Sequence, residues 1–121
     1  MAKQIYFGKS CEHKIFSKLL ELNFDTYLPV VDDKGIDCVI RIQDKIINIQ
    51  IKARKKGRAF NIGKIRNHKN YFYILLVEGN PNFYVVPSIK IKKMINKTKK
   101  LAQGKLNSSD YINRFDLLKN I

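Results

Sequence analysis

The sequence contains only two cysteines, Cys11 and Cys38, and no CxxC pair. Both lie in segments of apolar pattern, so the sequence suggests neither a zinc site nor a disulfide framework, and we expect two reduced core residues. The sequence also lacks an uninterrupted apolar run of about 18 residues, which argues against a transmembrane helix. Because the first ten residues, MAKQIYFGKS, lack the apolar stretch of a signal peptide, we expect a cytoplasmic protein.

Acidic side chains are scarce. Ten Asp and Glu residues stand against 24 Lys and Arg, which gives a formal charge of +14. Such an excess favours a polyanionic partner. Nucleic acid is expected rather than a membrane surface, because the lysines are spread through every segment. The alternative is a well-solvated surface in a proteome rich in Lys and Ile.

The chain is nevertheless rich enough in apolar residues to fold. Its 121 residues are 45% apolar, which exceeds the content of a disordered segment. This length suits one domain, residues 1–121, and leaves little room for a binding module separate from a catalytic one. We therefore expect the site and the scaffold to share the same elements.

Apolar periodicity and turn residues predict an alternation of helices and strands. Ser10 is expected to cap the first helix, and Ser108 or Ser109 the last. Residues 55–69 read as a basic connection containing a short helix, and residues 97–105 as an exposed loop. The elements expected are a helix over about 9–22, an extended run over 24–31, strands over 36–42, 46–54, 71–77 and 83–86, and helices over 89–95 and 109–118.

The predicted hairpin of the strands 36–42 and 46–54 is the best-defined feature. Alternation places one set of apolar side chains on a common core face: Ile36, Cys38, Ile40, Ile42, Ile47, Ile49, Ile51 and Ala53. If the chain turns through Gln43 and Asp44, Asp37 lies directly opposite Gln50, with Cβ atoms about 5 Å apart. Lys52 then projects from the same face as Gln50, one step along the strand.

Glu12 is an anomaly in the first predicted helix, because it lies on the apolar side, before Ile15 and Phe16. One interpretation is that its carboxylate completes a metal site beneath the helix. The other is that it favours the first helical turn through the helix dipole. Asp32 and Asp33 are further candidates for a metal, although such a pair more often marks a turn.

These residue types suit phosphodiester hydrolysis. A hard divalent cation takes oxygen ligands, which Asp37, the Gln50 side-chain carbonyl, the backbone carbonyl of residue 51 and water can supply. Such a metal lowers the pKa of bound water and stabilises charge on the scissile phosphate. Lys52 could orient the nucleophile or neutralise the transition state.

The segments GIDCVI at 35–40 and IQIK at 49–52, preceded by a helix that bears Glu12, resemble the PD-(D/E)XK nuclease superfamily. The resemblance covers residues 8 to about 87. It implies an α/β fold with a restriction-endonuclease-like αβββαβ core, whose central mixed sheet is flanked by helices. By position, Asp37 matches the metal-binding Asp, Gln50 the acidic residue, Lys52 the motif lysine and Glu12 the helix glutamate of resolvase-like members.

The same resemblance implies an endodeoxyribonuclease that uses Mg²⁺, with Mn²⁺ as a substitute, and that works on DNA as a homodimer. Small members include Holliday-junction resolvases, and some homing endonucleases also carry Gln before X-Lys. Two positions depart from the pattern, since Ile36 replaces the proline and Gln50 is neutral. The alternatives are a module that binds nucleic acid without cutting it, and a basic RNA-associated structural protein.

A basic stripe follows the predicted site, and backbone phosphates would neutralise it with release of counterions. We expect phosphate contacts from Arg54, Lys55, Lys56, Arg58, Lys64 and Arg66. The aromatic run Tyr71, Phe72 and Tyr73 could stack on bases, but in a buried strand it is expected to belong to the core.

Overall fold

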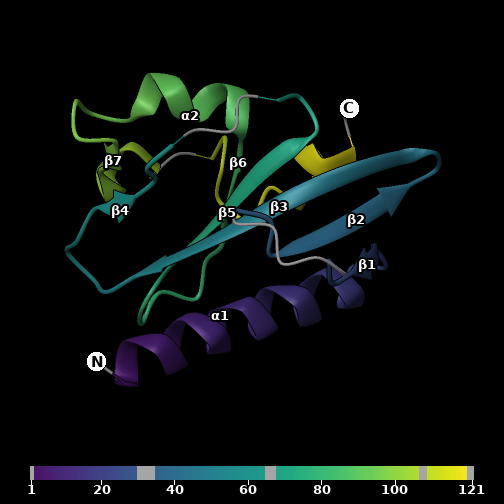
Figure 1. The fold of residues 1–121 in the computed structure, drawn as a ribbon, viewed down its shortest axis with the longest axis horizontal. Helices are drawn as coiled ribbons and strands as arrows, with labels where there is room; N and C mark the ends of the chain where they lie inside the picture. Colours follow the sequence, from purple (N-terminus) through teal and green to yellow (C-terminus); the bar gives the residue numbers. More distant parts are fainter. Residues whose placement is uncertain (1, 30–34, 65–67, 107–108, 120–121) are drawn as a thin grey trace.

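The computed structural model describes residues 2–29, 35–64, 68–106 and 109–119. A mixed sheet of five strands, in the order β1-β2-β3-β5-β6, forms the centre of the molecule (Figure 1). Its strands are β1 (Asp25–Tyr27), β2 (Cys38–Ile42), β3 (Lys45–Arg54), β5 (Tyr71–Val77) and β6 (Tyr84–Pro87). The other elements are α1 (Ala2–Glu21), β4 (Phe60–Asn61), α2 (Ser88–Met94), β7 (Lys100–Leu101) and the 3₁₀ turns Gln103–Leu106 and Phe115–Lys119.

The long helix α1 covers one face of the sheet. Ile15 and Leu19 have no exposed surface, and Cys11 is 6% exposed, because this stripe packs on β2, β3 and β5. The helix ends at Glu21, and Asn23, with a φ of 66°, lets the N–H of Phe24 donate to the Leu19 carbonyl. The predicted start near residue 9 is wrong, since α1 begins at Ala2 and places Ser10 inside the helix rather than at its cap.

The β2–β3 hairpin has the predicted register. Cys38 pairs with Ile49, and Ile42 pairs with Lys45, so the turn is the two residues Gln43 and Asp44. Gln43 has a φ of 57°, the positive value that a tight hairpin turn demands. This register determines which residue of β3 lies beside each residue of β2.

The second face of the sheet is covered by α2 and by the small sheet of β4 and β7, which lie opposite α1 in Figure 1. Strand β5 runs parallel to β3 and is buried along its whole length, because both of its faces are covered. The prediction that Tyr71, Phe72 and Tyr73 belong to the core is confirmed.

Three predictions outside the hairpin are wrong. The described part of residues 55–69 holds the strand β4 instead of a helix. Residues 97–105 are not simply an exposed loop, because β7 buries Leu101 against β4. In place of a helix over 109–118, turns lead to the 3₁₀ turn Phe115–Lys119, because the backbone nearby pairs with the start of β6.

Candidate active site

The carboxylate of Asp37 lies at the point where β2 begins beside β3. Asp37 stands one residue before Cys38, which pairs with Ile49, so it lies just outside the paired residues of β2. The predicted pairing of Asp37 with Gln50 is not among the paired residues, and Asp37 instead bonds to Ile49 and Ile51. Its N–H donates to the Ile49 carbonyl at 2.8 Å, and its Oδ2 accepts a 2.7 Å bond from the N–H of Ile51. The carboxylate therefore takes the place of a backbone carbonyl of a strand neighbouring β3. It lies in the plane of the sheet.

This geometry corrects one part of the predicted pattern. Ile36 does not share a core face with Cys38, because it packs against the cluster on the α2 side, whereas Cys38 lies in the cluster on the α1 side. The chain before β2 no longer follows regular strand alternation. Asp37 is half-buried just before β2, where its carboxylate bonds to the backbone of β3.

Glu12 approaches Asp37 from the α1 side. Burial raises the pKa of the Glu12 carboxyl, and the negative charge of Asp37 raises it further. Lys9, with its Nζ 3.8 Å from Glu12 Oε2, and His13 act in the opposite direction but do not cancel the effect. The Asp37 charge therefore acts on Glu12 across the space between α1 and the start of β2.

Lys52 also interacts electrostatically with Asp37. Its side chain is half-buried, and burial lowers the pKa of its ammonium group below the ordinary value. The charge of Asp37 opposes this effect, while Arg54 adds to it. Lys52 therefore lies within electrostatic reach of Asp37, in a place where a positive charge is poorly solvated.

Gln50 contacts a residue that the sequence did not single out for the site. The hydroxyl of Tyr71 lies 3.1 Å from Gln50 Oε1, and it also donates to the Gly35 carbonyl. The parallel pairing of β3 and β5 places Tyr71 opposite Asn48, two residues before Gln50. No local pattern could have revealed this neighbour, because 21 residues separate Tyr71 from Gln50.

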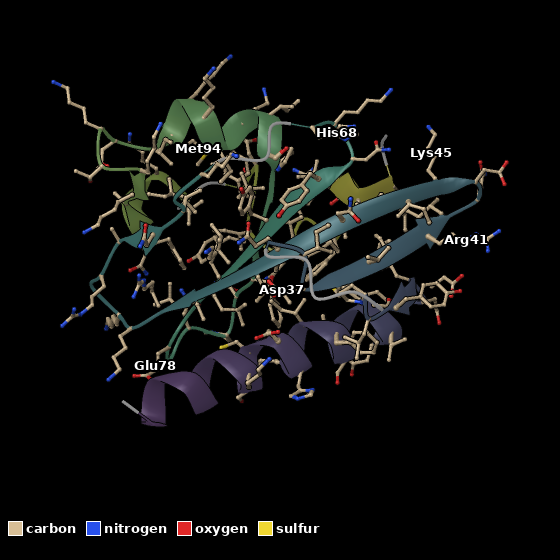
Figure 2. The ribbon with its side chains drawn as sticks, in the orientation of Figure 1. Asp37, Arg41, Lys45, His68, Glu78 and Met94 are labelled. Carbon is tan, nitrogen blue, oxygen red and sulfur yellow. The ribbon has the colours of Figure 1, made fainter. Side chains whose placement is uncertain are left out.

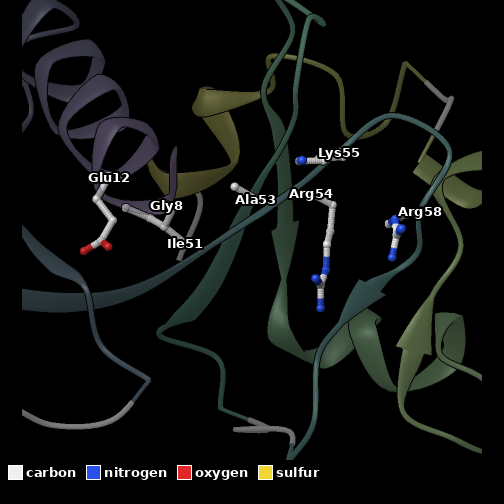
Figure 3. Close-up of a pocket in the computed structure, with 7 residues that line it drawn as sticks. All are labelled: Gly8, Glu12, Ile51, Ala53, Arg54, Lys55 and Arg58. Carbon is white, nitrogen blue, oxygen red and sulfur yellow. The ribbon is translucent and has the colours of Figure 1, made fainter. Parts of the chain in front are cut away.

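A pocket of about 220 Å³ lies between the first half of α1 and the end of β3. In Figure 3, Glu12 reaches from the helix toward β3, and three cations project from the end of β3 and the segment after it. The lining residues are Gly8, Glu12, Ile51, Ala53, Arg54, Lys55 and Arg58. The lining thus contains one carboxylate and three cations, which suits an anionic group such as a phosphate.

The predicted phosphate-binding residues that the structure describes are accessible. Arg54 is half-buried, and Lys55, Lys56, Arg58 and Lys64 are exposed. Arg66 lies outside the described residues, as do the alternative metal ligands Asp32 and Asp33. In the view of Figure 2, Asp37 is labelled between α1 and β3.

The oxygen donors fit a hard cation better than a transition metal. Within the described ranges, no group of three or more His, Cys, Asp and Glu side chains could hold a metal. The predicted ligands Asp37 and Glu12 supply two carboxylates, and Gln50 can supply an amide oxygen. The Ile51 carbonyl adds a fourth donor, because it points to the same strand edge as the Ile51 N–H. Such an all-oxygen set is what Mg²⁺ prefers.

No family model and no curated protein matches the sequence. A search of solved structures finds a similar fold in the bacterial homing endonuclease I-Ssp6803I, with a TM-score of 0.69 over 93% of this chain and 89% of the other. The two sequences are 16% identical, so this likeness establishes the fold. No helix in the described part of the chain is long and apolar enough to cross a membrane.

Proposed function

We propose that this chain is a Mg²⁺-dependent endonuclease of the PD-(D/E)XK type, which hydrolyses phosphodiester bonds in DNA. One observation carries the proposal. Asp37 lies where β2 begins beside β3, with its carboxylate bonded to the Ile51 N–H, and its charge acts on both Glu12 and Lys52. The fold shared with a homing endonuclease supports the same reading.

In this proposal Asp37, Glu12 and Gln50 hold the metal. A bound Mg²⁺ would lower the pKa of a water molecule and stabilise negative charge on the scissile phosphate. Metal binding would also relieve the repulsion that raises the pKa of Glu12. Mn²⁺ is expected to substitute, because it accepts the same oxygen ligands.

Lys52 supplies the catalytic cation. The negative charge of Asp37 favours the protonated form of the Lys52 Nζ, which would place a positive charge where the phosphate would lie. Because the side chain is half-buried, this charge is less screened by water than that of a surface lysine. The lysine would therefore stabilise charge that develops on the phosphate oxygens, and it would orient the attacking water.

The basic stripe would bind the DNA backbone next to the metal. Arg54, Lys55 and Arg58 line the pocket that contains Glu12. Lys56 and Lys64 are exposed nearby in sequence, and Arg66 completes the proposed set. Since cutting both strands needs two sites, we propose a homodimer as the active form.

A second candidate function is DNA binding without cleavage, and the neutral Gln50 favours it. An amide in place of a carboxylate weakens the attraction for a divalent ion. Such a protein would keep the salt-dependent affinity of the basic stripe. It would show no metal-dependent turnover.

The distinguishing experiment is cleavage of labelled duplex, single-stranded and four-way-junction DNA with Mg²⁺, Mn²⁺ or EDTA. Metal-dependent cutting of any of these supports the nuclease, and the preferred DNA defines its substrate class. Binding that needs no metal, with no cutting on all three DNAs, supports the second candidate. Preference for RNA without cutting would instead favour an RNA-associated structural protein.

A further inference from the structure

The hydroxyl of Tyr71 lies between two oxygen atoms of the candidate site. It contacts the Gly35 carbonyl and, at 3.1 Å, Gln50 Oε1. Tyr71 is only 3% exposed, and its ring packs against Tyr73 at the start of β5, so the hydroxyl is fixed in place. Both neighbours belong to segments that supply proposed metal ligands.

A phenolic hydroxyl has one hydrogen and cannot donate to both oxygens. The Gly35 carbonyl can only accept, so the hydrogen belongs to that contact. The Gln50 amide has another option, because its oxygen and nitrogen exchange places when the group turns by half a rotation. With the nitrogen toward Tyr71, the amide donates to the phenolic oxygen and both contacts are satisfied.

From this hydrogen-bond accounting we propose that Tyr71 is a positioning residue that turns the Gln50 amide, so that Nε2 faces Tyr71 and Oε1 faces the metal site. The inference rests on the proposed function and adds a reason why a neutral side chain can serve there. An amide has a single oxygen, and it is a useful ligand only when that oxygen is oriented. A carboxylate at the same place has two equivalent oxygens and needs no such partner.

The same hydroxyl also holds the segment that leads to Asp37. Gly35 has a φ of 98°, a backbone conformation that favours glycine, and its carbonyl accepts the Tyr71 hydrogen bond. Tyr71 thus connects the segment that leads to Asp37 with the part of β3 that carries Gln50. The orientation of the amide and the position of the Gly35 segment are separable effects.

The side-chain amide of Gln50 gives a direct readout that needs no activity. In ¹⁵N-labelled protein, its NH₂ signals are identified by their loss in Gln50→Glu. We expect them to exchange at least about fivefold more slowly than exposed Gln amides in the wild type, and to lose this protection in Tyr71→Phe. Tyr84→Phe is the matched control, because it removes another buried hydroxyl, whose partner Asn80 lies in a distant turn. Fast exchange in the wild type, or unchanged protection in Tyr71→Phe, would overturn the proposal.

Metal affinity separates amide orientation from an effect on the Gly35 segment. We expect Tyr71→Phe to weaken Mn²⁺ binding by calorimetry about fivefold to tenfold in the Gln50 protein, and less than about twofold in the Gln50→Glu protein. An equal loss in both proteins would show that Tyr71 acts through Gly35, and would overturn its role in orienting the amide. If the wild type fails to cut DNA, the proposed function fails, while the amide exchange result still tests Tyr71.

Discussion

The carboxylate of Asp37 accepts a 2.7 Å hydrogen bond from the backbone N–H of Ile51, in the plane of the sheet. This bond gives Asp37 a structural role besides its proposed role as a metal ligand. A substitution at this position must therefore distinguish the loss of charge from the loss of the hydrogen bond.

Asp37→Asn and Asp37→Ala make this distinction. The amide oxygen of Asn can still accept the Ile51 N–H, so we expect the Asn variant to fold with nearly wild-type stability. Alanine leaves that half-buried N–H without its partner, and we expect a loss of about 1–3 kcal/mol in the free energy of unfolding. Urea denaturation measures both values. Equal losses in the two variants would contradict the structural role of the Asp37–Ile51 bond.

Glu12→Gln is expected to stabilise the metal-free protein. The folded-state pKa of Glu12 is raised by burial and by Asp37, so ionisation of this carboxyl opposes folding. The gain should be absent at acid pH, appear as pH rises through the ordinary pKa of Glu, and be complete above the raised folded pKa. Because the side chain is partly exposed, we expect no more than about 1 kcal/mol.

Mg²⁺ should reverse this order of stability, so that the wild type becomes more stable than Glu12→Gln. Thermal unfolding with increasing Mg²⁺ is expected to raise the melting temperature of the wild type, and to raise that of Glu12→Gln much less. Glu21→Gln, at the exposed end of the same helix, is the control and should respond like the wild type. Equal Mg²⁺ responses in all three proteins would contradict a role for Glu12 in binding metal.

Lys52→Met tests whether the half-buried cation serves catalysis rather than folding. Burial lowers the pKa of Lys52, so its charged form is costly in the folded protein, and an apolar side chain of similar shape should not reduce stability. We expect the rate of DNA cleavage to fall by about 10²-fold to 10³-fold. Lys18→Met on α1 removes a charge away from the site and should keep its activity. A folded Lys52→Met protein that cuts at the wild-type rate would exclude the proposed role of this lysine.

Arg58→Gln tests the phosphate contacts of the basic stripe. Loss of one contact should weaken binding to all duplexes alike and reduce the slope of log affinity against log salt by about 0.9. Fluorescence anisotropy at several salt concentrations measures this slope, with Lys18→Gln as a control of equal charge change. An unchanged slope in Arg58→Gln would place the DNA elsewhere.

The hairpin register could be predicted from sequence because two signals agree. The alternation of residues 46–54 fixes which side chains face the core, and the polar residues Gln43 and Asp44 fix the turn. Together they place Asp37 next to the segment of β3 that contains Gln50. The position of Glu12 on the apolar side of α1 also indicated a neighbour, since an isolated carboxylate is costly there.

The orientation of Asp37, the position of Tyr71 and the structure near the C-terminus could not be predicted, because they depend on contacts between distant segments. The orientation of Asp37 follows from the end of the β2–β3 pairing, and the position of Tyr71 follows from the parallel pairing of β3 and β5. Near the C-terminus, apolar spacing imitates a helix. The carbonyl of Tyr111 instead accepts a bond from Val85, and Asn113 donates to Phe83, so tertiary pairing overrides the local pattern.

The most direct test of the account is cleavage of duplex DNA by wild type and Asp37→Asn across a Mg²⁺ titration, with folding checked by circular dichroism. The Asn variant keeps an acceptor for the Ile51 N–H but loses the charge that would hold the metal. We expect Mg²⁺-dependent cutting by the wild type and a loss of at least about 10²-fold in the folded variant. Equal cutting by the two proteins, or cutting by the wild type that persists in EDTA, would contradict the central claim.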